Sequence, residues 1–194
     1  MMRTLAMPVL AFLSITSSFA GSADKKFQPG PVEQYSHQTN DQVTLGAKAF
    51  TDSEEVKRVF GKKVDLNRFG VLPVLLVVQN GRKQSLDLNA LRVRLVPSRG
   101  KSIVPIDANQ VTSLGRTGGP PTINPQRLPR FHKNPLDSLS IVERAFAAQM
   151  VPTGDNASGF FYFEARHEPG MKLLVEGIYE RPSGKEILYF EIPL

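Results

Sequence analysis

A ten-residue segment, VLPVLLVVQN at residues 71–80, constrains the fold of this chain more than any other. Its apolar residues fall on both alternating faces, and a strand tolerates that pattern only where both faces are covered. We therefore expect a central strand here. In a sandwich one face meets the opposing sheet, and a short helix over residues 54–60, or a loop, covers the other. Asp52 and Ser53 can cap that helix, and Gly61 is placed to stop it.

Further strand patterns recur on either side of this segment, with turn signals between them. Apolar and polar residues alternate over 43–49 and 91–95, and a shorter pattern follows at 102–106. The Asn80-Gly81 pair predicts a tight turn, with residues 85–88 as the hairpin partner of the central strand.

The C-terminal half shows further strand patterns separated by turn signals. Four consecutive aromatics in GFFYFEA at 159–165 fit a second central strand that uses both faces. Residues 172–179 and 186–192 form the clearest hairpin, joined around Pro182-Ser183-Gly184. The sequence therefore predicts a mainly β domain, an immunoglobulin-like antiparallel sandwich of seven or eight strands with one or two short helices.

Residues 107–136 interrupt this pattern as a long loop insertion rich in proline and glycine. A connection of this length is either functional or disordered. The following segment, 139–148, has mixed helical and strand spacing, and we expect a short helix that runs into an extended end at Met150-Val151.

The N-terminal segment, residues 1–20, has the pattern of a secretory signal peptide. An apolar run at 5–15 follows a basic start, and small residues at Ser18 and Ala20 suit a signal peptidase. The alternative is a retained membrane anchor, but the apolar run is well short of the roughly 20 residues that span a bilayer. We therefore predict export to a bacterial periplasm or the exterior, with no stable membrane anchor.

Composition narrows the class of protein further. Residues 21–41 are polar and show no periodicity, which predicts a flexible arm before a single domain at 42–194. The chain has no cysteine, so disulfides, thiol catalysis and cysteine-ligated metals are excluded. The net charge of +6 favours anionic polymers of the cell envelope as partners but is modest for a nucleic-acid-binding protein.

Three stretches carry a resemblance to a group of uncharacterised exported bacterial proteins. They are GVLPVLLVVQN at 70–80, RAFAAQMVPTGDNASGFFYFEA at 144–165 and GKEILYFEIPL at 184–194. The residues that match the group's strand-and-turn pattern are Val78, Asn80, Pro152, Gly154, Gly159, Phe160 and Phe163. The resemblance implies an immunoglobulin-like domain and an exported location, and it implies no catalytic or ligand residues.

Few residues suggest catalysis or metal binding. None of the three histidines falls in a spacing that places two ligands on one face. The best metal candidate is Glu164 with His167 and Glu168, against a solvated strand end, and His132 with Asp137 is the best acid–base pair. We therefore expect no catalytic residues, no metal and no cofactor.

One set of basic residues suggests binding. Two of them lie on the solvent-facing side of the predicted strand at 91–95, Arg92 and Arg94. The other four lie in the 107–136 loop: Arg116, Arg127, Arg130 and Lys133. They could form a patch for phosphate-bearing or carboxylate-bearing polymers, or be ordinary solvated charges. Phe131 is the loop's only aromatic, so base stacking has little support and no nucleic-acid partner is expected.

These observations favour an exported, non-enzymatic sandwich that binds a protein or polymer partner in the bacterial envelope. Two alternatives stay open. The first is binding of polyanions or anionic glycans through the basic 107–136 loop, and the second is a hydrolase that depends on His132 or His167.

Overall fold

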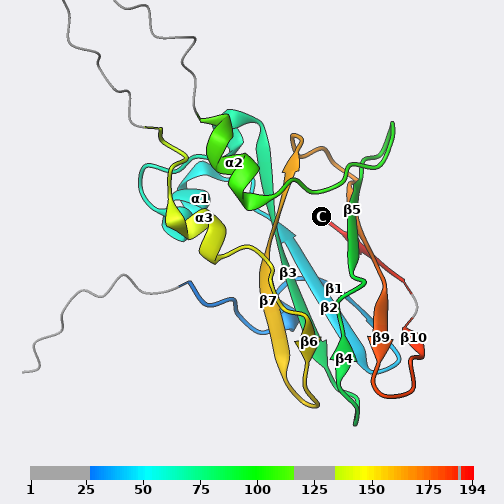
Figure 1. Cartoon of the computed structure of the whole chain (residues 1–194). Helices are drawn as coiled ribbons and strands as arrows, with labels where there is room; N and C mark the ends of the chain where they lie inside the picture. The colour runs from blue at the N-terminus through cyan, green and yellow to red at the C-terminus, as the bar shows by residue number, and fades with distance from the viewer. Residues whose placement is uncertain (1–26, 116–133, 188) are drawn as a thin grey trace, which may run out of the picture.

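The computed structural model of the chain describes residues 27–115, 134–187 and 189–194. They form two layers of antiparallel strands and a third layer of short helices (Figure 1). The prediction of a mainly β domain with antiparallel, sandwich-like layers is confirmed.

The first layer is a four-stranded sheet with the order β1-β2-β3-β7, and every neighbouring pair is antiparallel. Its strands are β1 (Ser36–Asn40), β2 (Val43–Ala49), β3 (Val71–Asn80) and β7 (Asn156–Glu164). The ten-residue β3 lies between β2 and β7 and pairs with both over most of its length.

The second layer consists of two small sheets with the orders β10-β9-β4-β6 and β11-β8-β5. The strands are β4 (Leu86–Asp87), β5 (Arg92–Val96), β6 (Met150–Val151), β8 (Lys172–Glu176), β9 (Ile178–Glu180), β10 (Glu186–Ile187) and β11 (Phe190–Pro193). Gly177, with φ of 79°, separates β8 from β9. A side chain there would meet the Ala90 carbonyl oxygen, so glycine lets the two chain segments approach.

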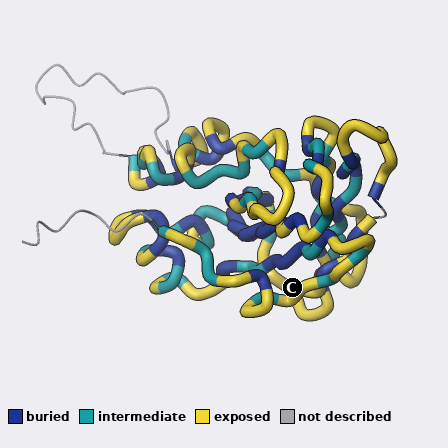
Figure 2. Tube along the Cα trace, turned by 90° about the horizontal axis from the view of Figure 1, so that it is seen from below, coloured by how far each residue is buried: buried dark blue, intermediate teal, exposed yellow. Residues whose placement is uncertain are grey.

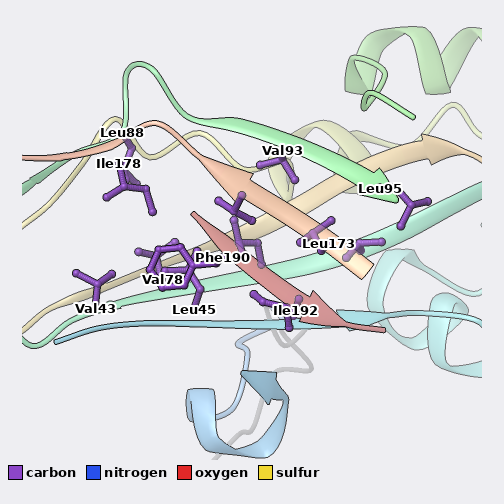
Figure 3. Packing of buried hydrophobic residues seen from close by; sticks show 14 of the residues in the cluster. Val43, Leu45, Val78, Leu88, Val93, Leu95, Leu173, Ile178, Phe190 and Ile192 are labelled. Atoms are coloured by element: carbon purple, nitrogen blue, oxygen red, sulfur yellow. The ribbon is translucent and has the colours of Figure 1, made fainter. Parts of the chain in front are cut away.

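An inner core fills the space between the two layers. Val43 and Leu45 of β2 point toward Leu173 of β8 and toward Phe190 and Ile192 of β11 (Figure 3). All five side chains are fully buried. This is the packing that alternating strands produce when each sheet turns one apolar face toward the other.

An outer core lies on the opposite face of the first sheet, beneath the helical layer. That layer comprises η1 (Val32–Gln34), α1 (Ser53–Phe60), η2 (Asn67–Phe69), α2 (Ala108–Leu114) and α3 (Leu139–Glu143). Val56 and Phe60 of α1 pack with Leu75 and Val77 of β3 in this core. Buried positions lie along the interior segments and exposed ones along the outer turns (Figure 2).

Two central predictions are confirmed by these cores. The strand over 71–80 is buried on both faces, with one face in each core. The helix over 54–60 covers its outer face, and the Asp52 carboxylate caps it by accepting hydrogen bonds from the backbone N–H groups of Glu54 and Glu55. Gly61 ends the helix, as expected.

The predicted hairpin between 71–80 and 85–88 is wrong. β4 pairs with β6 and β9 of the second layer, not with β3. The reason is Asn80, whose buried side-chain amide donates to the carbonyl oxygens of Gln84, Val151 and Pro152. These bonds direct the chain across to the second layer.

The predicted arm over 21–41 is wrong for its last part. Residues 36–40 form β1 in register with β2, and η1 precedes them. Gln38 Oε1 accepts the backbone N–H of Glu191 at 2.7 Å, and Asn40 Nδ2 donates to the carbonyl of Tyr189 at 2.9 Å. Polar side chains therefore fix β1 beside the edge of β11, and such contacts leave no periodic signal.

Three further predictions need adjustment. The strand over 159–165 uses both faces, but β7 is the last strand of its sheet, and the isolated bridges of Ile106 and Ala145 cover its outer edge. Residues 102–106 form only isolated bridges, at Ile103 and Ile106. The predicted loop over 107–136 begins with α2, which Asp107 caps.

The remaining elements agree with the sequence. The 172–192 hairpin is divided into β8 with β11 and β9 with β10. The segment after residue 138 forms α3 and then reaches β6 at Met150–Val151. The signal-peptide prediction for residues 1–20 lies outside the described residues.

Candidate functional site

An aromatic groove lies on the outer face of the first sheet, and Phe27 occupies its centre. The Phe27 ring packs against Phe160 of β7, with 5.6 Å between ring centroids, and against Phe50, at 6.3 Å in an edge-on arrangement. Phe50 and Phe160 are 5.2 Å apart, and Phe60 lies 4.9 Å from Phe160. Four phenylalanines from four separate segments therefore form one continuous cluster.

The positions of these rings follow from the local structure. Phe160 and Tyr162 alternate with Phe161 and Phe163 along β7, so the first pair faces the outer core and Phe163 faces the inner core. Phe60 is the last residue of α1, whose apolar side lies on the sheet.

A glycine shapes one wall of the groove. The segment after α3 runs directly beside β7: Phe160 N donates to Arg144 O at 2.8 Å, and Phe146 N donates to Phe160 O at 3.0 Å. A Cβ on Gly159 would lie 2.4 Å from the Phe146 Cα. Only glycine allows this backbone approach, so Gly159 positions the wall that carries Arg144.

Two hollows flank Phe27, which lines both of them. The first hollow, of about 240 Å³, lies against Leu75, Arg144, Ser158 and Phe160. The second hollow, of about 370 Å³, lies against Tyr35, Lys48, Phe50 and Arg58. The Phe27 side chain thus fills the middle of the groove and leaves space on either side.

The rim of the groove is charged. Lys48 Nζ lies 2.5 Å from the carboxylate of Glu55 and 5.0 Å from the centre of the Phe50 ring. Arg144 lies over the Phe60 ring, at 5.9 Å. Within the described part of the chain neither Arg144 nor Arg58 forms an ion pair. One guanidinium group therefore stands beside each hollow without an ion-pair partner, and one carboxylate also lines each hollow, Glu143 the first and Glu55 the second.

The segment that carries Phe27 has few attachments. Gly30 N donates to the Tyr35 hydroxyl at 2.8 Å, and Pro31 O accepts from Gln34 N at 3.1 Å. Phe27 itself is half-buried. Residues 27–31 are thus attached mainly through one aromatic side chain and two hydrogen bonds.

The buried polar groups near the groove serve the fold. The Tyr162 hydroxyl donates to Ile141 O at 2.7 Å, and burial raises the pKa of this phenol well above its ordinary value. Ser138 and Ser140 both donate to Phe60 O at the end of α1. Among the described residues every buried side-chain nitrogen and oxygen has a hydrogen-bond partner.

Two of the predicted binding residues lie far from this groove. Arg92 and Arg94 are on β5, where Val93 and Leu95 face the inner core, so the arginines face outward from the second layer. Arg94 forms an ion pair with Glu176 at 2.7 Å. The other four lie outside the described residues: Arg116, Arg127, Arg130 and Lys133. The predicted basic patch as a whole stays a prediction.

The metal and acid–base candidates gain no support. Glu164, His167 and Glu168 follow one another at an exposed strand end, and the described ranges contain no cluster of three potential ligands arranged to hold a metal ion. His132 lies outside the described residues, while its proposed partner Asp137 is exposed. No helix in the described ranges is long and apolar enough to cross a membrane.

The sequence reasoning missed the groove. Phe27 is the one large apolar residue in the polar segment 21–34 apart from Val32, and that isolation is the only signal that could have identified it as an anchor. Its contacts are with residues far along the chain, and neither strand nor helix periodicity reveals such contacts.

The comparisons with known proteins include a distant likeness to a solved structure. No family model matches the chain, and no curated protein shows significant similarity to it. One solved structure is a "putative lipoprotein (ycdA)" from Bacillus subtilis, with 12% sequence identity and a TM-score of 0.41. The alignment covers 82% of this chain and 38% of that one, so the chain spans less than half the length of that protein.

Proposed function

We propose that this chain is an exported, non-catalytic sandwich protein that binds a protein partner of the bacterial envelope through the aromatic groove. One observation carries the proposal. Phe27, on a loosely attached segment, packs against the Phe50–Phe160 pair, and an unfilled hollow lies on each side of it. A concave, aromatic-lined surface with a few polar groups on its rim is typical of a binding site.

The location and the finer fold rest on the sequence. The pattern of residues 1–20 supports export, and the absence of cysteine fits a bacterial protein that needs no disulfide. The immunoglobulin-like arrangement is part of the same proposal, and two antiparallel layers around one inner core support it.

The non-catalytic role is supported by how the buried polar groups are used. Asn80 and Tyr162 bond to backbone carbonyl oxygens, and Glu180 bonds to Arg82 and Ser183. Catalysis usually requires polar groups that converge on a cavity with free hydrogen-bonding capacity. In the described residues these groups stabilise loops and strand ends.

The test uses two matched substitutions on one strand. Ser158 is exposed on β7 and lines the first hollow, so Ser158→Phe fills that space without entering a core. Glu164 is exposed on the same face of β7, roughly 20 Å away at 3.3 Å per residue, and does not line the groove. Glu164→Phe is therefore the control.

Each purified variant is immobilised and exposed to envelope extract. The proposal predicts that wild type and Glu164→Phe retain the same partner and that Ser158→Phe loses most of it, with all three proteins showing the same thermal midpoint. Equal retention by the three proteins, or turnover in a substrate screen without any retained partner, contradicts it.

A further inference from the structure

We infer that the groove recognises an extended peptide through one aromatic side chain flanked by carboxylates, and that residues 27–31 of the chain occupy this seat as an internal competitor. The inference rests on the proposed function, because it names the partner chemistry and the regulation of the same groove. Three features of the structure support it.

The first feature is the shape of the seat. The Phe27 ring contacts Phe50 edge-on and Phe160 at a tilt, with centroid distances of 6.3 and 5.6 Å. These are the arrangements that aromatic rings prefer, and they favour an aromatic side chain over an aliphatic one of similar size. Phe27 therefore occupies the groove in the way that we expect of an aromatic side chain from a partner.

The second feature is the backbone of the segment. Residues 27–31 read FQPGP and form no helix or strand, and Pro31 has φ −55° and ψ 149°. These angles are close to polyproline II, a conformation that extended peptides adopt at low entropic cost before they bind. The two prolines of the segment, Pro29 and Pro31, favour the same extended conformation that we expect of a partner peptide.

The third feature is the charge that the internal segment leaves uncompensated. Arg144 stands at the first hollow beside Glu143, and Arg58 stands at the second beside the Lys48–Glu55 ion pair. Neither guanidinium group forms an ion pair within the described residues. Gln28 and Pro29, next to Phe27, supply no carboxylate. A peptide with acidic residues beside its aromatic gains charge-assisted contacts that residues 27–31 do not make.

These features imply competition within one chain. A tethered segment acts at a millimolar effective concentration, so it lowers the apparent affinity of the groove for any peptide in solution. The Tyr35 hydroxyl is part of this tether, because it accepts the hydrogen bond of Gly30 N–H. Removing either Phe27 or that hydroxyl should expose the seat.

The probe is an acetylated peptide, EWQPE. Because the chain has no tryptophan, the probe's fluorescence reports its own burial without a protein background. We expect Phe27→Ala to bind it at least about tenfold more tightly than wild type, with Tyr35→Phe between the two. Tyr189→Ala removes an exposed aromatic from the second layer and serves as the matched control, with wild-type affinity.

Two further comparisons test the seat and its charges. Ser158→Phe combined with Phe27→Ala should abolish binding. In the Phe27→Ala background, Arg144→Ala should weaken EWQPE several-fold and leave the neutral peptide QWQPQ unchanged, with the difference shrinking at high salt. Circular dichroism of every variant establishes that the fold is retained.

The following results overturn the inference. Equal affinity of wild type and Phe27→Ala excludes an internal competitor, and absence of probe binding to both Phe27→Ala and Tyr35→Phe excludes an aromatic seat. A wild-type dimer that Phe27→Ala dissociates shows that the segment binds a second copy instead. If one of these results is obtained but Ser158→Phe still abolishes partner retention, the inference fails and the proposed function stands. If the probe binds but no partner is retained from the extract, the proposed function alone is refuted.

Discussion

Arg82 donates two hydrogen bonds to a single oxygen of Glu180, from Nε at 3.0 Å and from Nη2 at 2.6 Å. The other Glu180 oxygen accepts from the Ser183 hydroxyl at 2.6 Å. The Arg82 guanidinium also donates to Asp41 O, and Lys185 pairs with the Asp41 carboxylate. Three separate turns are therefore joined by one charged network.

This network makes stability depend on pH. The Ser183 hydroxyl and then Arg82 hold the pKa of Glu180 below its ordinary value, and Lys185 does the same for Asp41. A carboxylate with a lowered folded pKa contributes stability above its unfolded pKa, near 4, and that contribution is lost as the pH falls through the folded pKa. We therefore expect Glu180→Gln to lower the thermal midpoint at neutral pH and to flatten its decline between about pH 5 and pH 2. Thermal unfolding across this range measures the effect.

The control for that measurement is Glu168→Gln, an exposed carboxylate in the turn after β7. It should reproduce the wild-type pH profile. If Glu180→Gln has the same profile as wild type, the network does not contribute to acid sensitivity.

The buried side-chain amide of Asn80 leads to a second prediction, in which the stability lost by a variant decreases as the pH falls. Its side-chain nitrogen donates to three backbone carbonyl oxygens, those of Gln84, of Val151 in β6 and of Pro152 directly after β6. Asn80→Asp would place a carboxylate against those oxygens and should cost about 3 kcal/mol at neutral pH. Protonation of the new group relieves the repulsion, so the loss should shrink as the pH falls. Urea unfolding at several pH values tests this, with the exposed Asn156→Asp as a near-neutral control.

The turn between β1 and β2 contains strain that a substitution can remove. Asp41 and Gln42 have φ of 48° and 64°, and the pairing of Asn40 with Val43 makes this a two-residue hairpin. Such turns favour glycine at the second position, because other residues pay roughly 1–2 kcal/mol in the left-handed region. Gln42→Gly should therefore stabilise the protein by about 0.5–1 kcal/mol after its entropic cost. A lower denaturation midpoint for Gln42→Gly than for wild type would contradict the assignment of strain.

Gly159 connects stability with the groove. Its Cβ would meet the backbone of Phe146, so Gly159→Ala must displace the segment beside β7 and should cost about 1–3 kcal/mol. The neighbouring exposed Ser158→Ala should change the free energy of unfolding by less than about 0.5 kcal/mol. In addition, Gly159→Ala should weaken EWQPE binding in the Phe27→Ala background, because Arg144 moves with the displaced wall. An unchanged free energy of unfolding for Gly159→Ala would show that the segment beside β7 can move without cost.

The sequence predicted the parts of the fold that local chemistry determines. The strand at 71–80 was predictable because burial of both faces leaves a continuous apolar run, and α1 because Asp52 and Gly61 act within one turn of its ends. The strand pairing of residues 85–88 was not predictable, because the Asn80 side chain forms hydrogen bonds that include one to a segment distant in sequence. The candidate site could not be predicted for the same reason, because Phe27 is positioned only by contacts with residues far along the chain.

The position of β3 in both cores has a consequence for how the protein loses its structure. Leu75 and Val77 belong to the outer core, while Leu76 and Val78 belong to the inner one. Neither layer can separate from the first sheet without exposing one row of this strand to water. The described body should therefore melt as one cooperative unit, with the amide protons of β3 among the slowest to exchange, and the groove should vanish in the same transition as the sandwich.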